Sequence, residues 1–259
     1  MKKSVQNLTV ISNKQLNRDH VLLELKSDIP LEGIVPGQFA NILVDHSTHV
    51  FLRRPFSIYR VDYKCNSISI LIKQVGEGTK CLSKCQTGDH LSVIFPLGKG
   101  YSLPEKNSRL LLVGGGVGVA PLMLLADILK QEAHQVEILL GARSSDDLIE
   151  LDIYAKFGNV HTTTEDGSHG IRGYVTDHPL FGSDLISFDK VYCCGPDPMM
   201  KAVARLARQN RVSCEVSLEN TMACGYGVCL CCVTDTTEGH RCVCTEGPVF
   251  DIKQLKWQN

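Results

Sequence analysis

Long hydrophobic runs are missing from this chain of 259 residues, because no stretch approaches the roughly eighteen consecutive apolar residues that cross a bilayer. An excess of charge is missing too, since 27 Lys and Arg are balanced by 28 Asp and Glu and the formal net charge is -1. This balance gives no electrostatic footprint for nucleic acid or for an anionic membrane surface. We therefore expect neither nucleic acid nor a membrane as a partner.

A secretory signal pattern is also missing at the amino terminus. Residues 1–4 are basic, but residues 5–9 alternate between polar and apolar side chains instead of forming an apolar core. We therefore expect a soluble, cytoplasmic protein. The nine histidines lack ligand spacing and no nucleophile–base pair is evident, so we expect no catalytic residue in this chain. The length allows two ordinary domains and a small appendix, and an apolar content of 43% supports sizeable cores.

Cysteine is the abundant residue with chemistry to offer. Twelve cysteines in a reducing compartment indicate metal or redox chemistry. Four of them, Cys224, Cys229, Cys232 and Cys244, follow the pattern C-x4-C-x2-C with a distant fourth Cys. This is the spacing of plant-type [2Fe-2S] ligands, in which glycines let the loop curl around the inorganic core. These four residues are the predicted metal ligands.

Other uses of these cysteines have to be weighed. Structural zinc sites usually separate two short pairs by a longer arm, whereas here three of the four predicted ligands fall within nine residues. A disulfide cluster would need several strained bridges in one short loop. Cys231 and Cys242 lie close to the predicted ligands and are rivals for a ligand position, although the spacing and the Gly-Pro after Cys244 favour Cys244.

Residues 4–95 carry short runs of β character, separated by turn residues such as Pro36-Gly37 and Gly88-Asp89. Their regular spacing is typical of an antiparallel barrel. Six strands are expected, at Leu8–Ile11, Val21–Leu25, Gln38–Val44, Pro55–Val61, Ser67–Lys73 and His90–Phe95.

Two places in this barrel depart from ordinary strand composition. The first is R-R-P-F-S at residues 53–57, where adjacent guanidinium groups would repel each other unless an anion such as a phosphate ester lay nearby. A solvated basic pair at a strand entrance explains this pattern equally well. The second is G-E-G-T at residues 76–79, which ends a strand and opens a short helical pattern, a junction that lets backbone N–H groups approach a phosphate.

R-P-F-S followed by G-E-G-T resembles the paired flavin-binding motifs of the ferredoxin-NADP reductase superfamily. The resemblance implies a six-stranded antiparallel barrel that holds FAD. It places Arg54, Gly78 and Thr79 on the pyrophosphate. It also places Phe56 against the flavin and Ser57 near the reactive ring nitrogen. The full set of implied FAD-binding residues is Arg54, Pro55, Phe56, Ser57, Leu71, Ile72, Lys73, Gly78 and Thr79.

After residue 101 the pattern changes to alternating strand and helix, which predicts a doubly wound parallel sheet. A Gly-rich turn at residues 114–118 precedes an amphipathic helix at Pro121–Lys130, with Pro close to the helix start. The expected strands are Arg109–Val113, Val136–Leu140, Val160–Thr163, Lys190–Cys193 and Ser213–Leu218.

The Gly-rich turn is not the orthodox dinucleotide fingerprint G-x-G-x-x-G. It resembles the superfamily's own turn, G-G-G-x-G-x-A-P, and C-G-P-D-P-M-M at residues 194–200 resembles its C-G-P motif. The resemblance makes Cys194 and Gly195 candidates for the nicotinamide side. Arg143 ends the second strand and would suit a 2′-phosphate, but a lone Arg there is as often a surface residue, so NAD and NADP both stay open at this position.

The order of the predicted modules suits an electron relay. A nicotinamide exchanges two electrons at once and a [2Fe-2S] centre takes one, so a flavin, which handles both, has to stand between them. No group in the sequence is suited to activating an organic substrate. We therefore expect substrate oxidation on a partner subunit that faces the cluster end of this chain.

The segments R-R-P-F-S, F-P-L-G-K-G-Y, G-G-G-V-G-V-A-P-L, L-G-A-R and M-A-C-G-Y-G-V-C-L-C-C together resemble the electron-transfer subunits of dihydroorotate dehydrogenase B over nearly the whole chain. The resemblance implies FAD and one [2Fe-2S] cluster per chain, with NAD as electron acceptor. It also implies a catalytic partner that carries FMN and oxidises dihydroorotate in pyrimidine synthesis, within a heterotetramer of two plus two chains. The expected domains are an FAD-binding β-barrel at residues 1–101, an NAD-binding α/β domain at 102–213 and a small [2Fe-2S] domain at 214–259.

Two residues depart from the family pattern. Phe95 stands where Gly is usual in the linker G-P-L-G, and Cys231 stands where a small apolar residue is usual. Two rival interpretations are kept. One is a subunit of another flavin iron-sulfur NAD(P)H oxidoreductase of the ferredoxin-NADP reductase type, and the other is a zinc-stabilised interaction module. A visible spectrum separates the two classes, because flavin and iron-sulfur centres absorb visible light and zinc does not.

Overall fold

The computed structural model describes residues 2–45, 49–105 and 107–257. The chain divides into two compact units. The barrel unit comprises Met1–Gly100, Glu219–Thr234 and Arg241–Pro248, and the sheet unit comprises Tyr101–Leu218, Asp235–His240 and Val249–Asn259. Residues after Leu218 are therefore shared between the two units, and the expected three-domain division stays a prediction.

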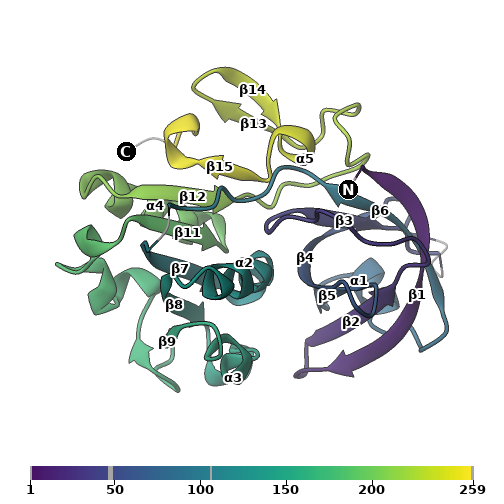
Figure 1. Ribbon diagram of the computed structural model, residues 1–259, viewed down its shortest axis with the longest axis horizontal. Helices are drawn as coiled ribbons and strands as arrows, with labels where there is room; N and C mark the ends of the chain where they lie inside the picture. Colours follow the sequence, from purple (N-terminus) through teal and green to yellow (C-terminus); the bar gives the residue numbers. More distant parts are fainter. Residues whose placement is uncertain (1, 46–48, 106, 258–259) are drawn as a thin grey trace. The chain divides into compact units, whose positions relative to one another are not determined.

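The barrel unit is built on a closed six-stranded barrel, drawn in purple and blue in Figure 1. Its strand order is β1-β2-β5-β4-β3-β6, and all pairings are antiparallel. This confirms the predicted barrel and its strand count. The strands are β1 Ser4–Gln15, β2 His20–Lys26, β3 Phe39–Ile42, β4 Arg54–Asp62, β5 Ser67–Lys73 and β6 His90–Leu97, with the helix α1 at Glu77–Leu82.

Alternating side chains explain why these segments form a barrel. In β5, Ile68, Ile70 and Ile72 are completely buried, and burying such side chains is the dominant favourable contribution to folding. The β1 strand runs four residues past its predicted end at Ile11. A register shift between Val10 and Ser12 lets the polar end of β1 keep pairing with β2, and a search for alternating apolar residues does not detect such a polar extension.

The sheet unit holds a seven-stranded sheet in the order β10-β9-β8-β7-β11-β12-β15. All neighbouring strands are parallel except β15, which is antiparallel to β12. The strands are β7 Arg109–Gly115, β8 Gln135–Ala142, β9 Asn159–Thr164, β10 Ile171–Arg172, β11 Lys190–Cys194, β12 Ser213–Ser217 and β15 Val249–Asp251. The helices are α2 Ala120–Gln131, α3 Leu151–Tyr154 and α4 Asp197–Gln209.

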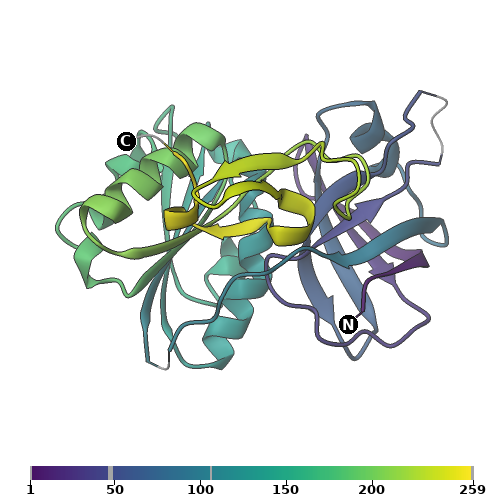
Figure 2. The ribbon, with the colours of Figure 1, turned by 90° about the horizontal axis from the view of Figure 1, so that it is seen from above.

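The order of these strands creates a switch point between β7 and β11. The chain leaves β7 through α2 for β8 on one side, and leaves β11 through α4 for β12 on the other. Because such crossovers are right-handed, α2 and α4 cover opposite faces of the sheet, as Figure 2 shows. This confirms the predicted doubly wound sheet. Ligands of such folds bind beyond the carboxyl ends of the strands at the switch point.

Two small features complete the chain. The strands β13, Val233–Thr236, and β14, Gly239–Cys242, form a hairpin, and the short helix α5 follows at Val243–Glu246. The sequence patterns did not predict this hairpin, β10 or β15, because each strand is only two to four residues long.

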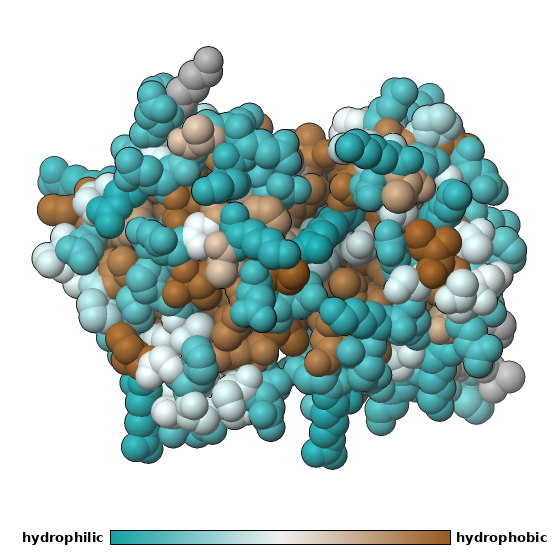
Figure 3. All heavy atoms as spheres, turned by 60° about the horizontal axis from the view of Figure 1, so that its bottom comes forward, coloured by the Kyte–Doolittle hydropathy of each residue, from teal (hydrophilic) through white to brown (hydrophobic). Residues whose placement is uncertain are grey.

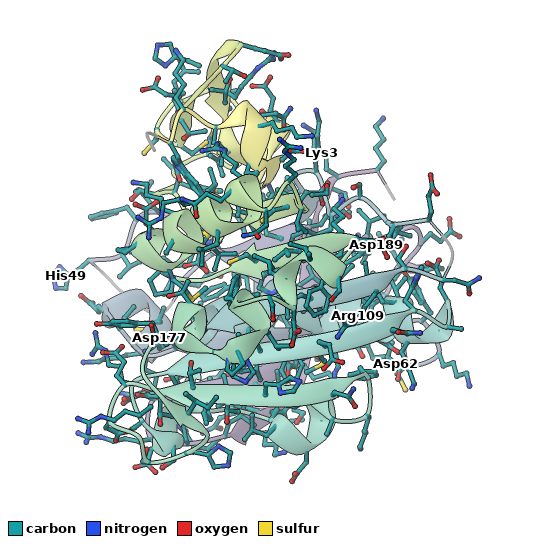
Figure 4. The ribbon with its side chains drawn as sticks, turned by 90° about the vertical axis from the view of Figure 1, so that its left-hand side faces the viewer. Lys3, His49, Asp62, Arg109, Asp177 and Asp189 are labelled. Atoms are coloured by element: carbon teal, nitrogen blue, oxygen red, sulfur yellow. The ribbon has the colours of Figure 1, made fainter. Side chains whose placement is uncertain are left out.

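Polar contacts fix the starts of neighbouring strands in the sheet unit. The backbone N–H of Arg109, at the start of β7, donates to Asp189 Oδ2 at 2.8 Å, just before β11 (Figure 4). The guanidinium carbon of Arg109 lies 4.5 Å from the ring centroid of Phe188.

On the face drawn in Figure 3, polar side chains are spread widely with apolar side chains between them. No helix in the described part of the chain is long and apolar enough to cross a membrane.

One buried histidine of the sheet unit is held in its neutral form. His178 Nδ1 accepts the backbone N–H of Leu180 at 3.2 Å and so caps a short 3-10 helix. Its ring centroid is 5.0 Å from that of His161, whose Nε2 lies 2.7 Å from Glu137 Oε2. Burial lowers the pKa of His178, and the charge of His161 lowers it further.

Candidate redox site

Three of the four predicted cluster ligands lie on a tight loop in the barrel unit. We call residues 224–232 the cysteine loop. Gly225 and Gly227 have φ values of +82° and +83°, in the left-handed region that glycine adopts without steric penalty. The loop therefore curls back on itself directly after Cys224.

Backbone N–H groups of the loop point at its sulfurs. The N–H groups of Tyr226 and Cys229 lie 3.4 and 3.5 Å from Cys224 Sγ. Partial burial raises the pKa of the Cys224 thiol, but hydrogen bonds from Cys229 and Tyr226 outweigh this effect and bring the pKa down to about 6. Cys224 is therefore prepared to be a thiolate, the form that binds metal.

The fourth predicted ligand is brought to the loop by α5. Cys244 is buried, its Sγ accepts the N–H of Gly227 at 3.1 Å, and its own N–H donates to Cys232 Sγ at 3.4 Å. Burial and a thiol hydrogen bond with Cys232 raise the pKa of Cys244 to about 12. Cys244 thus keeps its proton until a metal ion displaces it.

The rival cysteines are placed differently. Cys231 is exposed on the loop. Cys242 caps α5, and burial followed by the charges of the nearby thiols raises its pKa. Among the described residues, neither thiol receives the backbone N–H contacts found at Cys224, Cys232 and Cys244. Cys229 is also exposed and has no such contact in this part of the chain, so its choice over Cys231 rests on the spacing and on its hydrogen bond with Cys224. The ligand set stays a prediction.

The arrangement of the thiols suits a two-iron core. Cys224 contacts Cys229 and Cys232 contacts Cys244, so the four sulfurs form two pairs. Among the described residues, no three His, Cys, Asp or Glu side chains are gathered closely enough to hold a single metal ion. Four thiols with several N–H donors directed at them are the donor set of a [2Fe-2S] cluster, in which each iron takes two thiolates.

A buried amide lies against the cysteine loop and was not predicted. Asn41 is on β3, and neither Nδ2 nor Oδ1 has a hydrogen-bond partner among the described residues. A Cβ on Gly225 would lie 2.8 Å from Asn41 Nδ2 and 3.3 Å from Leu97 Cδ1. Burying an amide without a hydrogen-bond partner costs about 1–3 kcal/mol of folding free energy. The one available signal in the sequence is a polar residue inside the apolar run Phe39–Ile42.

The two adjacent arginines of the barrel have different roles. Arg53 donates to the backbone oxygen of Ser92 at 2.6 Å and to its Oγ at 2.9 Å, so it ties the start of β4 to β6. Arg54 lies against Gly78, since a Cβ on that glycine would be 3.1 Å from Arg54 Nε. The repulsion expected between the two guanidinium groups is therefore avoided, and Arg54 meets the second predicted motif.

The second motif forms the start of α1. Thr79 Oγ1 accepts the backbone N–H groups of Val75 and Gly76 at 3.0 Å and donates to the Gly76 oxygen. The hydroxyl of Thr79 is thus used to close its own turn, and the first N–H groups of the helix remain the natural phosphate donors there. Gly78 is buried against Arg54, so a side chain at this position would require the Arg54 side chain to shift.

The other predicted FAD residues lie on β4 and β5. Pro55, Phe56 and Ser57 are half-buried on β4, the strand between β3 and β5. Leu71 and Ile72 are buried on β5, so their side chains leave only backbone atoms for a ligand, and Lys73 is half-buried. The structure thus places Arg54 next to Gly78. The two residues predicted to lie beside the flavin ring, Phe56 and Ser57, are neighbours on β4.

The predicted nucleotide motifs meet at the switch point of the sheet unit. A Cβ on Gly118 would lie 2.5 Å from Gly195 Cα and 2.7 Å from the carbonyl carbon of Cys194. A Cβ on Gly115 would lie 2.5 Å from Met199 Sδ. The Gly-rich turn and the C-G-P turn are therefore in backbone contact. Cys194 and Gly195 are both buried, and Pro196 is the first exposed residue of the C-G-P turn.

The loops after β8 and β9 are joined near Arg143. The N–H of Asp166 donates to the Arg143 oxygen at 3.2 Å, and the N–H of Ser145 donates to Ser168 Oγ at 2.7 Å. Hydrogen bonds from Ser168 lower the pKa of Asp166. The carboxylates of Asp146, Asp147, Glu165 and Asp166 thus accompany the single positive charge of Arg143 in these two loops.

Three sequence families match successive parts of the chain. Residues 7–101 match an oxidoreductase FAD-binding domain and residues 112–205 match an oxidoreductase NAD-binding domain. Residues 219–256 match the iron-sulfur cluster binding domain of dihydroorotate dehydrogenase B.

Whole-chain relatives are similar along their full lengths. The chain is 36% identical to the electron transfer subunit of dihydroorotate dehydrogenase B (NAD(+)) from Shouchella clausii, covering 98% of this chain and 99% of the relative. It is 38% identical to the subunit of the same name from Fusobacterium nucleatum, covering 95% and 96%. A solved NADH-dependent reduced ferredoxin-NADP oxidoreductase, studied for flavin-based electron bifurcation, has a TM-score of 0.87 and 30% identity over 99% of this chain and 92% of that chain.

Proposed function

Because the chain belongs to the family of dihydroorotate dehydrogenase B electron-transfer subunits, we propose that it passes electrons from a dihydroorotate-oxidising partner to NAD+ in pyrimidine synthesis. The chain is an oxidoreductase subunit with FAD-binding, NAD-binding and iron-sulfur binding domains, as the sequence predicted. The observation that carries the proposal is the pairing of four thiols in the cysteine loop and α5 within a barrel of the FAD-binding family.

The residues of this chain hold and orient the redox groups. When bound, the cluster exchanges single electrons and FAD converts them to the two-electron exchange of NAD. Cys224, Cys229, Cys232 and Cys244 ligate the cluster, and backbone N–H groups hold the thiolates in place. Arg54, with the first turn of α1, neutralises the FAD pyrophosphate, since a guanidinium pairs with phosphate oxygens through two N–H groups.

NAD, rather than NADP, is the proposed electron acceptor. Arg143 lies in the loop after β8 and Arg172 packs against Gly167 in the loop after β9, but the four carboxylates of Asp146, Asp147, Glu165 and Asp166 outnumber these two positive charges. A 2′-phosphate would be repelled by these carboxylates, whereas the free ribose hydroxyls of NAD can donate to them.

The proposed partner is a catalytic subunit that carries FMN, in a heterotetramer of two plus two chains. Several apolar side chains of the cysteine loop are exposed in the isolated chain, namely Tyr226, Val228 and Leu230. Val228 precedes the predicted ligand Cys229 directly. Exposed apolar side chains beside a redox centre are a reasonable contact surface for the subunit that donates the electrons.

The test is co-expression of the chain with an FMN-containing subunit that oxidises dihydroorotate. We expect a complex with equal numbers of both chains, a visible spectrum with flavin and iron-sulfur absorption, and orotate formation that depends on NAD+. A chain that neither associates with this subunit nor gives it the use of NAD+ would refute the proposal. A colourless protein containing zinc would support the interaction-module interpretation.

A second candidate function is a subunit of a flavin-based bifurcating oxidoreductase. It is favoured by the solved NADH-dependent reduced ferredoxin-NADP oxidoreductase, which is 30% identical over nearly the whole chain. The same preparation separates the two candidates. Ferredoxin-coupled NADP reduction without dihydroorotate oxidation would favour the second.

A further inference from the structure

Asn41 is an unusual residue for its position in the barrel. It is the third residue of β3, where it pairs with Pro55 on β4 and Ile94 on β6, and the other three residues of the strand are apolar. Its relative exposure is 0%, yet both polar atoms of its amide lack a partner among the described residues. Buried polar groups are nearly always hydrogen-bonded. We therefore expect a bound group to supply the hydrogen-bond partner of this amide.

The amide is directed at the cysteine loop. Asn41 Nδ2 lies 2.8 Å from the position that a Cβ of Gly225 would occupy, and Leu97 Cδ1 lies 3.3 Å from the same point. Gly225 directly follows Cys224, and it lines a cavity of about 230 Å³ together with Leu97 and Cys244. Only a glycine at position 225 leaves room for the amide to lie this close to the loop.

The chemistry of the neighbouring groups selects the kind of partner. Thiolates and inorganic sulfides are hydrogen-bond acceptors, and the loop already directs the N–H groups of Tyr226, Gly227 and Cys229 at sulfur. We propose that Asn41 Nδ2 donates a further hydrogen bond to a sulfur of the bound [2Fe-2S] cluster at its Cys224 end, and thereby raises the reduction potential of the cluster. This inference rests on the proposed ligation of a cluster by the cysteine loop.

The direction of the effect follows from charge. A reduced cluster carries one more negative charge than an oxidised cluster, and an N–H donor to sulfur stabilises the more negative form more strongly. Removing the donor therefore lowers the reduction potential. In this proposal Asn41 changes the reduction potential of the cluster through a hydrogen bond and does not ligate iron.

The test is the variant Asn41→Leu, which keeps the branched shape of the side chain and removes both polar atoms. The protein is purified with FAD and cluster bound, and the cluster is titrated reductively while its reduced form is followed by EPR. We expect the reduction equilibrium to shift about tenfold toward the oxidised form, equivalent to about 59 mV for a one-electron couple. Asn41→Asp, which has no N–H donor, should shift it in the same direction.

The matched control is Ile42→Val, which perturbs the adjacent buried residue of β3 without touching the amide. It should leave the potentials of both the cluster and FAD unchanged. A cluster potential that is the same in Asn41→Leu and in the wild type would overturn the inference. A shift of the FAD potential alone would also overturn it, because the amide would then serve the flavin.

A different result would reject the proposed function instead. Iron and sulfide analysis of the wild-type protein must find a cluster, and its absence would remove the premise without involving Asn41. If Asn41→Leu does not fold, the protein with Asn41 intact can be labelled with 15N in the asparagine side chains. Because Asn220 Nδ2 donates to the Cys232 oxygen at 3.3 Å, the labelled protein carries Asn220→Ser. Pulsed EPR of its reduced cluster should then detect a side-chain nitrogen, and a spectrum without this coupling would contradict the inference.

Discussion

Replacing Gly118 with Ala tests the contact between the Gly-rich turn and the C-G-P turn. The new Cβ would lie 2.5 Å from Gly195 Cα and 2.6 Å from Gly195 N. These are backbone atoms, which a rotamer change cannot move. Ordinary contact begins near 3.4 Å, so the two turns would have to separate by about 0.9 Å.

The expected consequences are both structural and functional. Overpacking of this kind costs about 1–3 kcal/mol, which lowers the melting temperature by about 2–4 °C per kcal/mol for a chain of this size. A displacement of about 1 Å at a nucleotide site reduces the rate about 10²-fold. We therefore expect FAD reduction by NADH to slow about a hundredfold while FAD stays bound, as measured by stopped-flow absorbance.

A second glycine of the sheet unit provides the matched control. A Cβ on Gly158 would lie 2.3 Å from the backbone oxygen of Val136, at the amino ends of β8 and β9. Gly158→Ala should therefore lower the melting temperature without slowing the reaction with NADH. A Gly118→Ala protein that reacts with NADH at the wild-type rate would refute the reasoning, as would equal slowing in both variants.

Three further predictions concern the other sites. Arg54→Ala should weaken FAD binding about ten- to hundredfold, because it removes a charge-assisted hydrogen bond. The control Arg53→Ala should lower thermal stability and keep FAD bound. Equal loss of FAD from both variants in fluorescence titrations would contradict this prediction. Cys229→Ser should abolish the EPR signal of the cluster while FAD stays bound, and Cys231→Ser should keep the EPR signal. A normal cluster in the protein without Cys229 would overturn the ligand set. Because the folded state lowers the pKa of His178 from 6.5, the unfolded state takes up a proton first, and stability should fall by up to about 1.4 kcal/mol per unit as pH drops below this value. Urea unfolding of His178→Asn, which keeps a capping oxygen, should show a smaller loss of unfolding free energy over the same pH range. An unchanged dependence of the unfolding free energy on pH would show that another group causes it.

Local patterns were sufficient to predict most of the fold. The barrel strands carry alternating apolar residues, as in Ser67–Lys73, whose predicted and observed bounds agree. The parallel strand β7 is a continuous apolar run followed by a glycine-rich turn. Such signals lie within a few residues of one another. The fold class and the modules were therefore correct, while strand ends that rely on backbone pairing alone, as in β1, were missed.

Contacts between distant segments could not be read from the sequence. The pairing of Arg53 with Ser92 joins residues 39 positions apart, and nothing near Arg53 distinguishes it from Arg54. Asn41 and Gly225 are further apart still, and their contact depends on how the cysteine loop lies against the barrel strand β3. The cysteine spacing supplies a ligand set that stays a prediction, whereas the residues that surround these cysteines could be found only from the structure.

The strand β15 gives the last few residues of the chain a particular importance during synthesis. It pairs with β12 and begins five residues after Cys244, so the ribosome makes it after all four predicted ligands. Until it emerges, β12 has an open edge that can pair with other chains. A chain that stops at residue 248 would contain every thiol of the site and still present that edge. Residues 249–251 therefore cover an edge of the sheet that would otherwise be open to pairing with another chain, a task separate from electron transfer.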